Sequence, residues 1–150
     1  MQSPIDLSQA NAVGNVAISI DYKVNPLTVL NNGHTVQVNF PAGSNMTSGG
    51  KVFPLVQVHF HTPSEHVISG KSFPLVAHFV HATPEGALGV IGVMFDEGKN
   101  NPELQKIIDA APKEKTGPRT FSDVIIDPNA LFPDEIKVFR YMGSLTTPPC

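Results

Sequence analysis

Alternating apolar and polar positions recur along most of the chain, and this pattern predicts a sheet protein. Successive side chains of a strand point to opposite faces, so alternation marks a strand with one buried face. Clusters of Gly, Asn and Pro, such as Asn31-Asn32-Gly33 and Thr83-Pro84-Glu85-Gly86, separate the runs. We therefore predict seven short strands, at Val16–Tyr22, Leu27–Leu30, His34–Phe40, Gln57–His61, Pro74–His81, Leu88–Phe95 and Lys137–Tyr141.

One segment follows a helical period. Apolar residues recur at the spacing i, i+3, i+4 and i+7, at Leu104, Ile107, Ile108 and Ala111. Asn101 can cap this segment and Pro102 suits the first helical position. We predict a surface helix over 101–111 that packs on the sheet, and irregular structure in the Pro-rich stretch from Pro112 to Pro133.

The predicted strand Gln57–His61 is polar on one face and apolar on the other. His59 and His61 point to the same side, about 7 Å apart along the strand, so their imidazoles can converge on one ion. The predicted strand with His78 can supply a third imidazole, because the turn-rich stretch from Thr62 to Ser72 lets the two strands pair antiparallel. A lone strand histidine is more often a hydrogen-bonded residue, but three in this arrangement favour a metal site.

Zinc is the metal that this ligand set favours. Imidazole suits zinc, and three protein ligands leave the fourth position open for water. Iron, copper and nickel also accept imidazole, so the histidines alone leave the metal open.

Composition and charge narrow the class of protein. The chain has 150 residues, of which 41% are hydrophobic and 15% charged, enough for the core of a single domain over 1–150. A net charge of −3 without a basic cluster gives no reason to expect nucleic acid or an anionic membrane as partner. No run reaches the roughly 18 apolar residues of a membrane span, and no signal peptide follows Met1. Cys150 is the single cysteine, so an internal disulfide is excluded.

Five motifs, in chain order, resemble those of α-class carbonic anhydrases. They are Gln2–Asp6, Leu30–His34, Gln57–His61 followed by Ser64–His66, Ala77–His81 and Tyr141–Pro149. The unbroken string His59–His66 is more similar to bacterial members than to animal ones. The resemblance implies a mainly β fold: a large, twisted, mostly antiparallel (mixed) central sheet with a few short peripheral helices, incomplete at both termini.

The resemblance also implies an activity, the zinc-dependent reversible hydration of carbon dioxide to bicarbonate and a proton by attack of zinc-bound hydroxide. His59, His61 and His78 match the zinc ligands. Thr146 matches the threonine that accepts a hydrogen bond from the hydroxide and donates one to a glutamate, here Glu65. His34 matches the proton shuttle of this lyase. Hydrolysis of activated esters is an expected side reaction.

Other positions match the walls and supports of the family's site. Val80, Val90 and Leu145 match residues of the carbon dioxide pocket, and Thr147 lies beside its mouth. Two matching residues support the site from outside: Gln57, which fixes a ligand imidazole, and Tyr141, which belongs to the hydrogen-bond network near the threonine. His66 and His81 are expected to be structural.

The chain departs from the family in two places, at position 76 and at its ends. Val76 stands where a glutamate usually accepts the second ring N–H of the third ligand, so we expect looser or faster-exchanging zinc. The chain looks truncated at both ends, which is expected to lower stability and favour aggregation. In many secreted bacterial relatives, the cysteine at the position of Cys150 pairs with one upstream of the present Met1, which would explain the single thiol.

The same relatives imply a periplasmic or secreted location, and their activity implies carbon dioxide and bicarbonate as the small-molecule partners. The oligomeric state is left open, with a dimer among the choices. Two other classes fit part of the sequence. In a cupin-type metal-binding β-barrel, Glu65 would join the histidines as a ligand. A carbonic-anhydrase-like binding module would have lost catalysis, as Val76 and the missing ends suggest.

Overall fold

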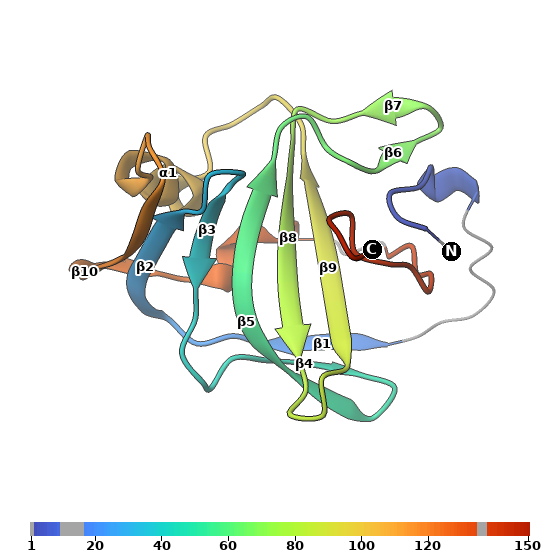
Figure 1. Ribbon diagram of the computed structural model, residues 1–150, viewed down its shortest axis with the longest axis horizontal. Coiled ribbons are helices and arrows are strands. Elements are labelled where there is room, and N and C mark those ends of the chain that lie inside the picture. The colour runs from blue at the N-terminus through green and yellow to red at the C-terminus, as the bar shows by residue number, and fades with distance from the viewer. Residues whose placement is uncertain (1, 10–16, 135–137) are drawn as a thin grey trace.

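The computed structural model describes residues 2–9, 17–134 and 138–150, and strands dominate them (Figure 1). Eight strands form the main sheet and two form a separate hairpin. The strands are β1 (Ile18–Asp21), β2 (Asn25–Asn31), β3 (Val36–Asn39), β4 (Asn45–Ser48), β5 (Lys51–His61), β6 (Val67–Ile68), β7 (Lys71–Ser72), β8 (Leu75–Ala82), β9 (Leu88–Phe95) and β10 (Thr116–Ile126). The helices are α1 (Pro102–Ala110) and the 3₁₀ turns η1 (Leu7–Gln9) and η2 (Pro128–Leu131).

The long strand β5 organises the main sheet. It pairs with β8 on one side and, through different stretches, with β3 and β4 on the other. β9 follows β8, β2 and β10 follow β3, and β1 pairs with β4. Every strand pair among the described residues is antiparallel, and an isolated bridge between Asp6 and Val67 is parallel. The predicted mainly β, mostly antiparallel sheet is therefore confirmed.

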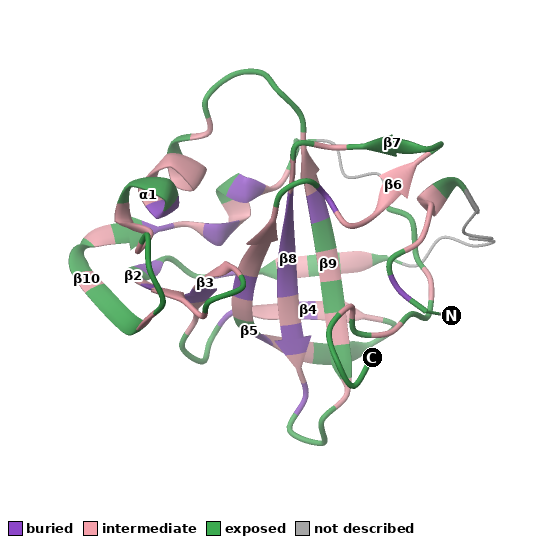
Figure 2. Cartoon of the chain, turned by 45° about the horizontal axis from the view of Figure 1, so that its top comes forward, coloured by how far each residue is buried: buried purple, intermediate pink, exposed green. Residues whose placement is uncertain are grey.

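The apolar core covers one face of this sheet. Val58 and Phe79 are fully buried there, and α1 contributes the buried side chain of Ile107. Figure 2 shows that β8 is buried along most of its length. Because alternate residues of β5 and β8 face this core, the remaining ones, His59, His61 and His78 among them, face the opposite side of the sheet.

His81 belongs to the core face, as the sequence predicts for a structural histidine. It is completely buried, its Nδ1–H donates to the carbonyl of Gly89 at 2.8 Å, and its Nε2 accepts from the hydroxyl of Tyr22 at 2.7 Å. Both ring nitrogens are thus satisfied, and the neutral tautomer is fixed.

Several predicted elements are confirmed with shifted ends. The helix forms with Asn101 as its cap, accepting hydrogen bonds from the backbone N–H groups of Glu103 and Leu104. The predicted strand Leu88–Phe95 has the observed bounds, whereas the one predicted from His34 begins at Val36, because a turn holds His34. Val16, the predicted start of the first strand, lies outside the described residues.

Two predictions were wrong. The stretch from Pro112 to Pro133 is not irregular, since it contains β10 and η2. Residues 138–141 form no strand, and Lys137 lies outside the described residues. The strand count was also too low, because β4 and the β6–β7 hairpin were not anticipated. No helix in the described ranges has the length and apolar character that crossing a membrane requires.

Candidate metal centre

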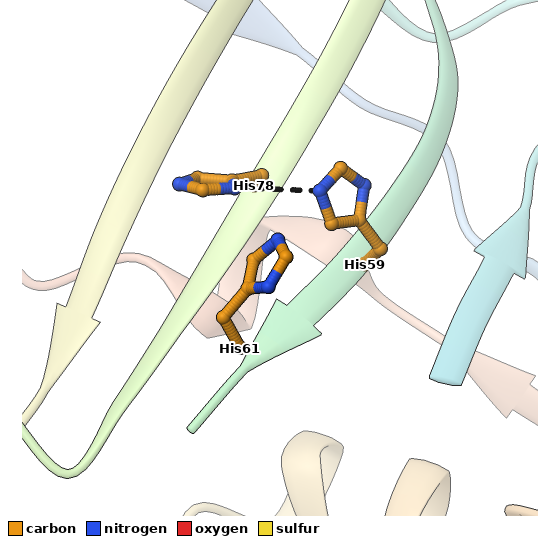
Figure 3. A group of neighbouring side chains, drawn as sticks. All are labelled: His59, His61 and His78. Atoms are coloured by element: carbon orange, nitrogen blue, oxygen red, sulfur yellow. Dashed lines mark hydrogen bonds between the residues drawn. The ribbon is translucent and has the colours of Figure 1, made fainter. Parts of the chain in front are cut away.

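The register of two strands brings three histidines together. His59 and His61 lie on the same face of β5, and His78 lies directly opposite His59 on β8 (Figure 3). The ring centroids are 5.0 Å apart for His59 and His61, 5.2 Å for His59 and His78, and 5.1 Å for His61 and His78. The three predicted ligands therefore form one cluster.

The cluster has the geometry and chemistry of a metal site. One nitrogen from each ring lies within 4.8 Å of the others, a separation that a single ion can bridge. Nε2 of His61 is buried and has no hydrogen-bond partner in the part of the chain that the structure describes. Buried ring nitrogens are normally paired, so this one fits the lone pair of a ligand. Three imidazoles suit zinc, with a fourth position left for water.

Burial keeps two of these imidazoles, those of His59 and His78, neutral. It lowers the pKa of His59 to about 4, and the neighbouring charge of His61 acts in the same direction. Burial lowers the pKa of His78 to about 3, with His59 and His61 adding to the effect. Since a metal binds the deprotonated ring, both lone pairs are available at neutral pH without a proton to displace.

Gln57 orients the first ligand. Its Oε1 accepts a hydrogen bond from Nδ1–H of His59 at 2.9 Å, which leaves Nε2 of that ring as the free lone pair. Nε2 of His59 in turn lies 3.3 Å from Nδ1 of His78. Gln57, which the sequence predicted to fix a ligand imidazole, is thus hydrogen-bonded to His59.

Glu65 and Thr146 meet beside the cluster although 81 positions separate them in the chain. The hydroxyl of Thr146 donates to Oε2 of Glu65 at 3.0 Å. The same carboxylate oxygen lies 3.5 Å from Nε2 of His61 and 3.7 Å from Nδ1 of His78. The predicted hydrogen bond between threonine and glutamate is thus present beside the three histidines.

A hydrogen-bond network joins the two ends of the chain behind the site. The hydroxyl of Tyr141 lies 2.5 Å from Nε2 of His66 and 2.6 Å from Oγ of Ser3. Ser3 and Ser144 exchange two further hydrogen bonds, N–H of Ser144 to Oγ of Ser3 at 3.1 Å and N–H of Ser3 to Oγ of Ser144 at 2.9 Å. The sequence predicted places for Tyr141 and His66 but missed both serines, although each lies in one of the matched motifs.

A cavity of about 330 Å³ reaches one histidine of the cluster, His61. Its lining includes His34, Phe60, His61 and Glu65. His34 is exposed and sits on a turn that Asn32 closes, because Oδ1 of Asn32 accepts from the backbone N–H of His34 at 2.9 Å. Gly33 has φ +90° in this turn, a conformation that side chains other than glycine rarely adopt. The structure thus places the predicted shuttle on the same cavity as a predicted ligand.

Two residues of the predicted apolar wall, Val80 and Val90, lie next to each other in the sheet. They are cross-strand partners on β8 and β9, on the face that carries His78. Val90 is 50% exposed and Leu145 41% exposed, and the cavity is lined by other residues. Leu145 and Thr147 flank Thr146 in sequence, but no described contact brings them to Val80 or Val90.

Known proteins resemble the chain over its whole length. The profile of the family described as eukaryotic-type carbonic anhydrase matches residues 1–150. The carbonic anhydrases of Nostoc sp. and Neisseria gonorrhoeae are each 40% identical to the chain, over 154 and 150 residues. A solved structure of the α-carbonic anhydrase from Thermovibrio ammonificans, in complex with the inhibitor sulfanilamide, is 45% identical and superposes with a TM-score of 0.92.

These alignments cover 99% of the chain in each case. They cover 58% of the Nostoc protein, 59% of the Neisseria protein and 66% of the Thermovibrio chain. The chain therefore spans less than two thirds of the length of these relatives. The matches contradict the cupin alternative, in which Glu65 was to be a metal ligand.

Proposed function

The chain belongs to the family of eukaryotic-type carbonic anhydrases, and from that premise we propose that it catalyses the zinc-dependent, reversible hydration of carbon dioxide to bicarbonate. The observation that carries this proposal is the cluster of His59, His61 and His78 with the bond between Thr146 and Glu65 beside it. The activity is proposed for the whole protein, and the three predicted zinc ligands all lie within this chain.

The three histidines would hold zinc through neutral rings. When bound, zinc lowers the pKa of a water ligand to about 7, a value known from carbonic anhydrases themselves, and so makes a nucleophile available at neutral pH. The protein's part is to keep the ligand lone pairs free. Burial of His59 and His78 and the hydrogen bond from His59 to Gln57 do this.

Thr146 would orient the nucleophile. An ionised carboxylate only accepts hydrogen bonds, so the single hydroxyl hydrogen of Thr146 is committed to Glu65. The oxygen of Thr146 can then act only as an acceptor toward the site. It therefore selects a nucleophile that presents a hydrogen, and turns the nucleophile's lone pair toward the substrate.

His34 would export the proton that hydration releases. Imidazole is the side chain best suited to accept and release protons at neutral pH. His34 is exposed, and it lines the cavity that also reaches His61 and Glu65. A proton accepted on the inner side of this cavity can leave to bulk water from the outer side.

Carbon dioxide carries no net charge, so an apolar surface beside the cluster would receive it. Val80 and Val90 supply part of that surface on the face of His78. Leu145 and Thr147 are proposed to complete it. Esters with good leaving groups are proposed as secondary substrates, since the same nucleophile attacks a carbonyl.

The test is zinc content per chain, paired with stopped-flow hydration of carbon dioxide before and after a chelator. We expect one zinc per chain, activity that the chelator removes, and recovery when zinc is returned. Replacement of His61 by Asn should abolish both zinc binding and activity. Zinc binding without hydration would favour the catalytically impaired binding module, and hydration that persists after zinc removal would refute the proposal.

We also propose a bacterial-type protein of the periplasm or of the secreted fraction. The bacterial relatives support the first half of this proposal, since those named above are 40% identical, whereas α carbonic anhydrase 4 of Arabidopsis thaliana is 36% identical. Fractionation of cells that express the full-length gene tests the location.

A further inference from the structure

Two buried ring nitrogens of the histidine cluster, Nε2 of His61 and Nε2 of His78, have no hydrogen-bond partner among the described residues, and that of His78 does not face the other ligands. Nδ1 of His78 faces the other ligands, 3.3 Å from Nε2 of His59 and 3.7 Å from Oε2 of Glu65. Nε2 of the same ring is directed away from them. It is buried, and within the described ranges no group forms a hydrogen bond with it.

Two neighbours in the sheet offer this nitrogen only hydrocarbon, and the ring of His66 packs edge to face against the ring of His78, with centroids 6.0 Å apart, without a hydrogen bond to it. Val76 lies two residues before His78 on β8, so both side chains point to the same face, and Val76 is completely buried. Gly92 lies opposite His78 on β9. A Cβ on Gly92 would lie 3.8 Å from Nε2 of His78 and 3.8 Å from Cγ2 of Val76. These two neighbours of His78 in the sheet therefore carry no acceptor in their side chains.

This matters for any metal that the site holds. A neutral imidazole that gives the lone pair of Nδ1 to a metal carries its proton on Nε2. In metal sites, that proton is normally donated to a carboxylate or a carbonyl, which fixes the ring and raises its basicity as a ligand. His78 has the ring orientation for a ligand without the acceptor that would support it.

We propose that Val76 makes this a fast-exchanging zinc site, and that position 76 controls how long the metal is retained. The inference rests on the proposed zinc site and deepens it. Loss of such an acceptor typically changes metal affinity or activity by about 10- to 100-fold. Zinc should therefore leave the chain about 10- to 100-fold faster than it leaves the same chain with an acceptor at position 76.

The experiment compares zinc release from the wild type with release from Val76→Gln, Val76→Glu and Val76→Leu. Each protein is loaded with zinc, and the first-order rate of transfer to excess chromophoric chelator is measured at neutral pH. Gln and Glu place an oxygen near Nε2 of His78, whereas Leu adds volume without an acceptor. We expect release to slow by about 10- to 100-fold in Val76→Gln and Val76→Glu, and Val76→Leu to stay close to the wild type.

A second pair of variants, at Gly92 on β9, changes the group next to Nε2 from the neighbouring strand. The test then does not depend on whether the position-76 variants fold. The Cβ position of residue 92 is in ordinary contact distance of the ring, so Gly92→Ser brings a hydroxyl within hydrogen-bond reach, and Gly92→Ala brings only the methyl group. We expect slower zinc release in Gly92→Ser than in Gly92→Ala. Circular dichroism and zinc stoichiometry identify any variant that does not fold.

The outcomes separate this inference from the proposed function. Equal release rates for Gln, Glu and Leu at position 76, with Ser and Ala also equal at position 92, would overturn the role of Val76 even if the wild type hydrates carbon dioxide. Slower release in the acceptor variants would support it even if no variant hydrates carbon dioxide. Zinc bound by Val76→Gln but not by the wild type would be the strongest support, and zinc bound by none of the proteins would overturn the inference.

Discussion

At the scale of a single residue, the proposed chemistry depends on the hydroxyl of Thr146. Its bond to Glu65, 3.0 Å long, commits its hydrogen and leaves its oxygen as an acceptor. Replacement by Ala removes that acceptor, so we expect hydration of carbon dioxide to fall by about 10- to 100-fold while zinc content stays the same. Stopped-flow rates and zinc content on the same samples measure both.

Thr146→Ser is the matched control, because it keeps the hydroxyl and removes only a methyl group. Most of the activity should remain in this variant. Equal losses in the Ala and Ser variants would contradict an orienting role and would indicate that the methyl group, and thus packing, is what matters.

The candidate ligands could be predicted because side chains alternate between the two faces of a strand. His59 and His61 had to share a face, and His81, three positions from His78, had to take the opposite one, where the structure buries it against Tyr22. The position of Ser3 in the hydrogen-bond network beside the site could not be predicted. Its bond to Tyr141 joins positions 138 apart, and no local pattern encodes a contact of that kind.

At the scale of one element, the start of α1 depends on a single side chain. Oδ1 of Asn101 accepts from the backbone N–H groups of Glu103 and Leu104 at 3.0 and 3.1 Å. Asn101→Ala leaves these donors unpaired, so we expect the free energy of unfolding to fall by about 0.5–2 kcal/mol. Urea denaturation followed by circular dichroism measures it.

Asn101→Asp keeps the capping oxygen and is the control for this prediction. It should retain most of the wild-type stability, although it loses the hydrogen bond that the Asn101 amide donates to the carbonyl of Ala130. A loss in the Asp variant as large as in the Ala variant would assign the stability to the contact with Ala130 instead.

β10 shows why one strand escaped prediction. Gly117 and Pro118 lie inside it, and both residues usually interrupt strands. β10 pairs only with β2 among the described elements, and its register shifts between Thr116 and Arg119 and again between Phe121 and Ile125. An edge strand with bulges tolerates a proline, because the missing N–H need not face a neighbour.

The stretch 138–141 shows the opposite error. Val138 and Phe139 give it the apolar character of a strand, yet they are 49% and 47% exposed, and the segment pairs with no described strand. A strand requires a neighbouring edge to pair with, and hydrophobicity alone does not supply one. Local sequence therefore predicted the central strands, where pattern and pairing agree, and failed at the margins of the sheet.

For the whole molecule, we expect the outer edge of β9 to favour association between chains. Among the described strands, β9 pairs only with β8, and its side chains Leu88 and Val90 are 52% and 50% exposed. An edge strand with exposed apolar residues tends to pair with another chain. Leu88→Lys should therefore raise the protein concentration at which aggregation begins and change the free energy of unfolding by less than about 0.5 kcal/mol.

Light scattering against protein concentration measures this effect, and Leu88→Ile is the control that keeps the apolar character. Association that is equal in the Lys and Ile variants would exclude this edge as its origin. The same measurement reports whether the protein is a monomer or a dimer at low concentration.

Buried histidines make the stability of the whole metal-free protein depend on pH. Burial lowers the pKa of His59 to about 4 and that of His78 to about 3, and it also lowers the pKa of His66 and of His81. In the unfolded chain these groups return toward their ordinary value of 6.5. Below that value the unfolded chain binds more protons than the folded protein, so stability is present in full above pH 6.5 and declines as the pH falls.

Urea denaturation of the metal-free protein from about pH 7.5 to about pH 4.5 should therefore show a plateau followed by a decline. Each histidine that takes up a proton on unfolding contributes a slope of at most about 1.4 kcal/mol per pH unit. Hydrogen bonds lower the carboxyl pKa of Asp6 and of Asp96, so these groups add to the decline only below about pH 4. His78→Asn removes one proton-binding group and should flatten the decline, whereas the same slope in that variant, or a constant stability down to pH 4.5, would show that the cluster does not resist protonation.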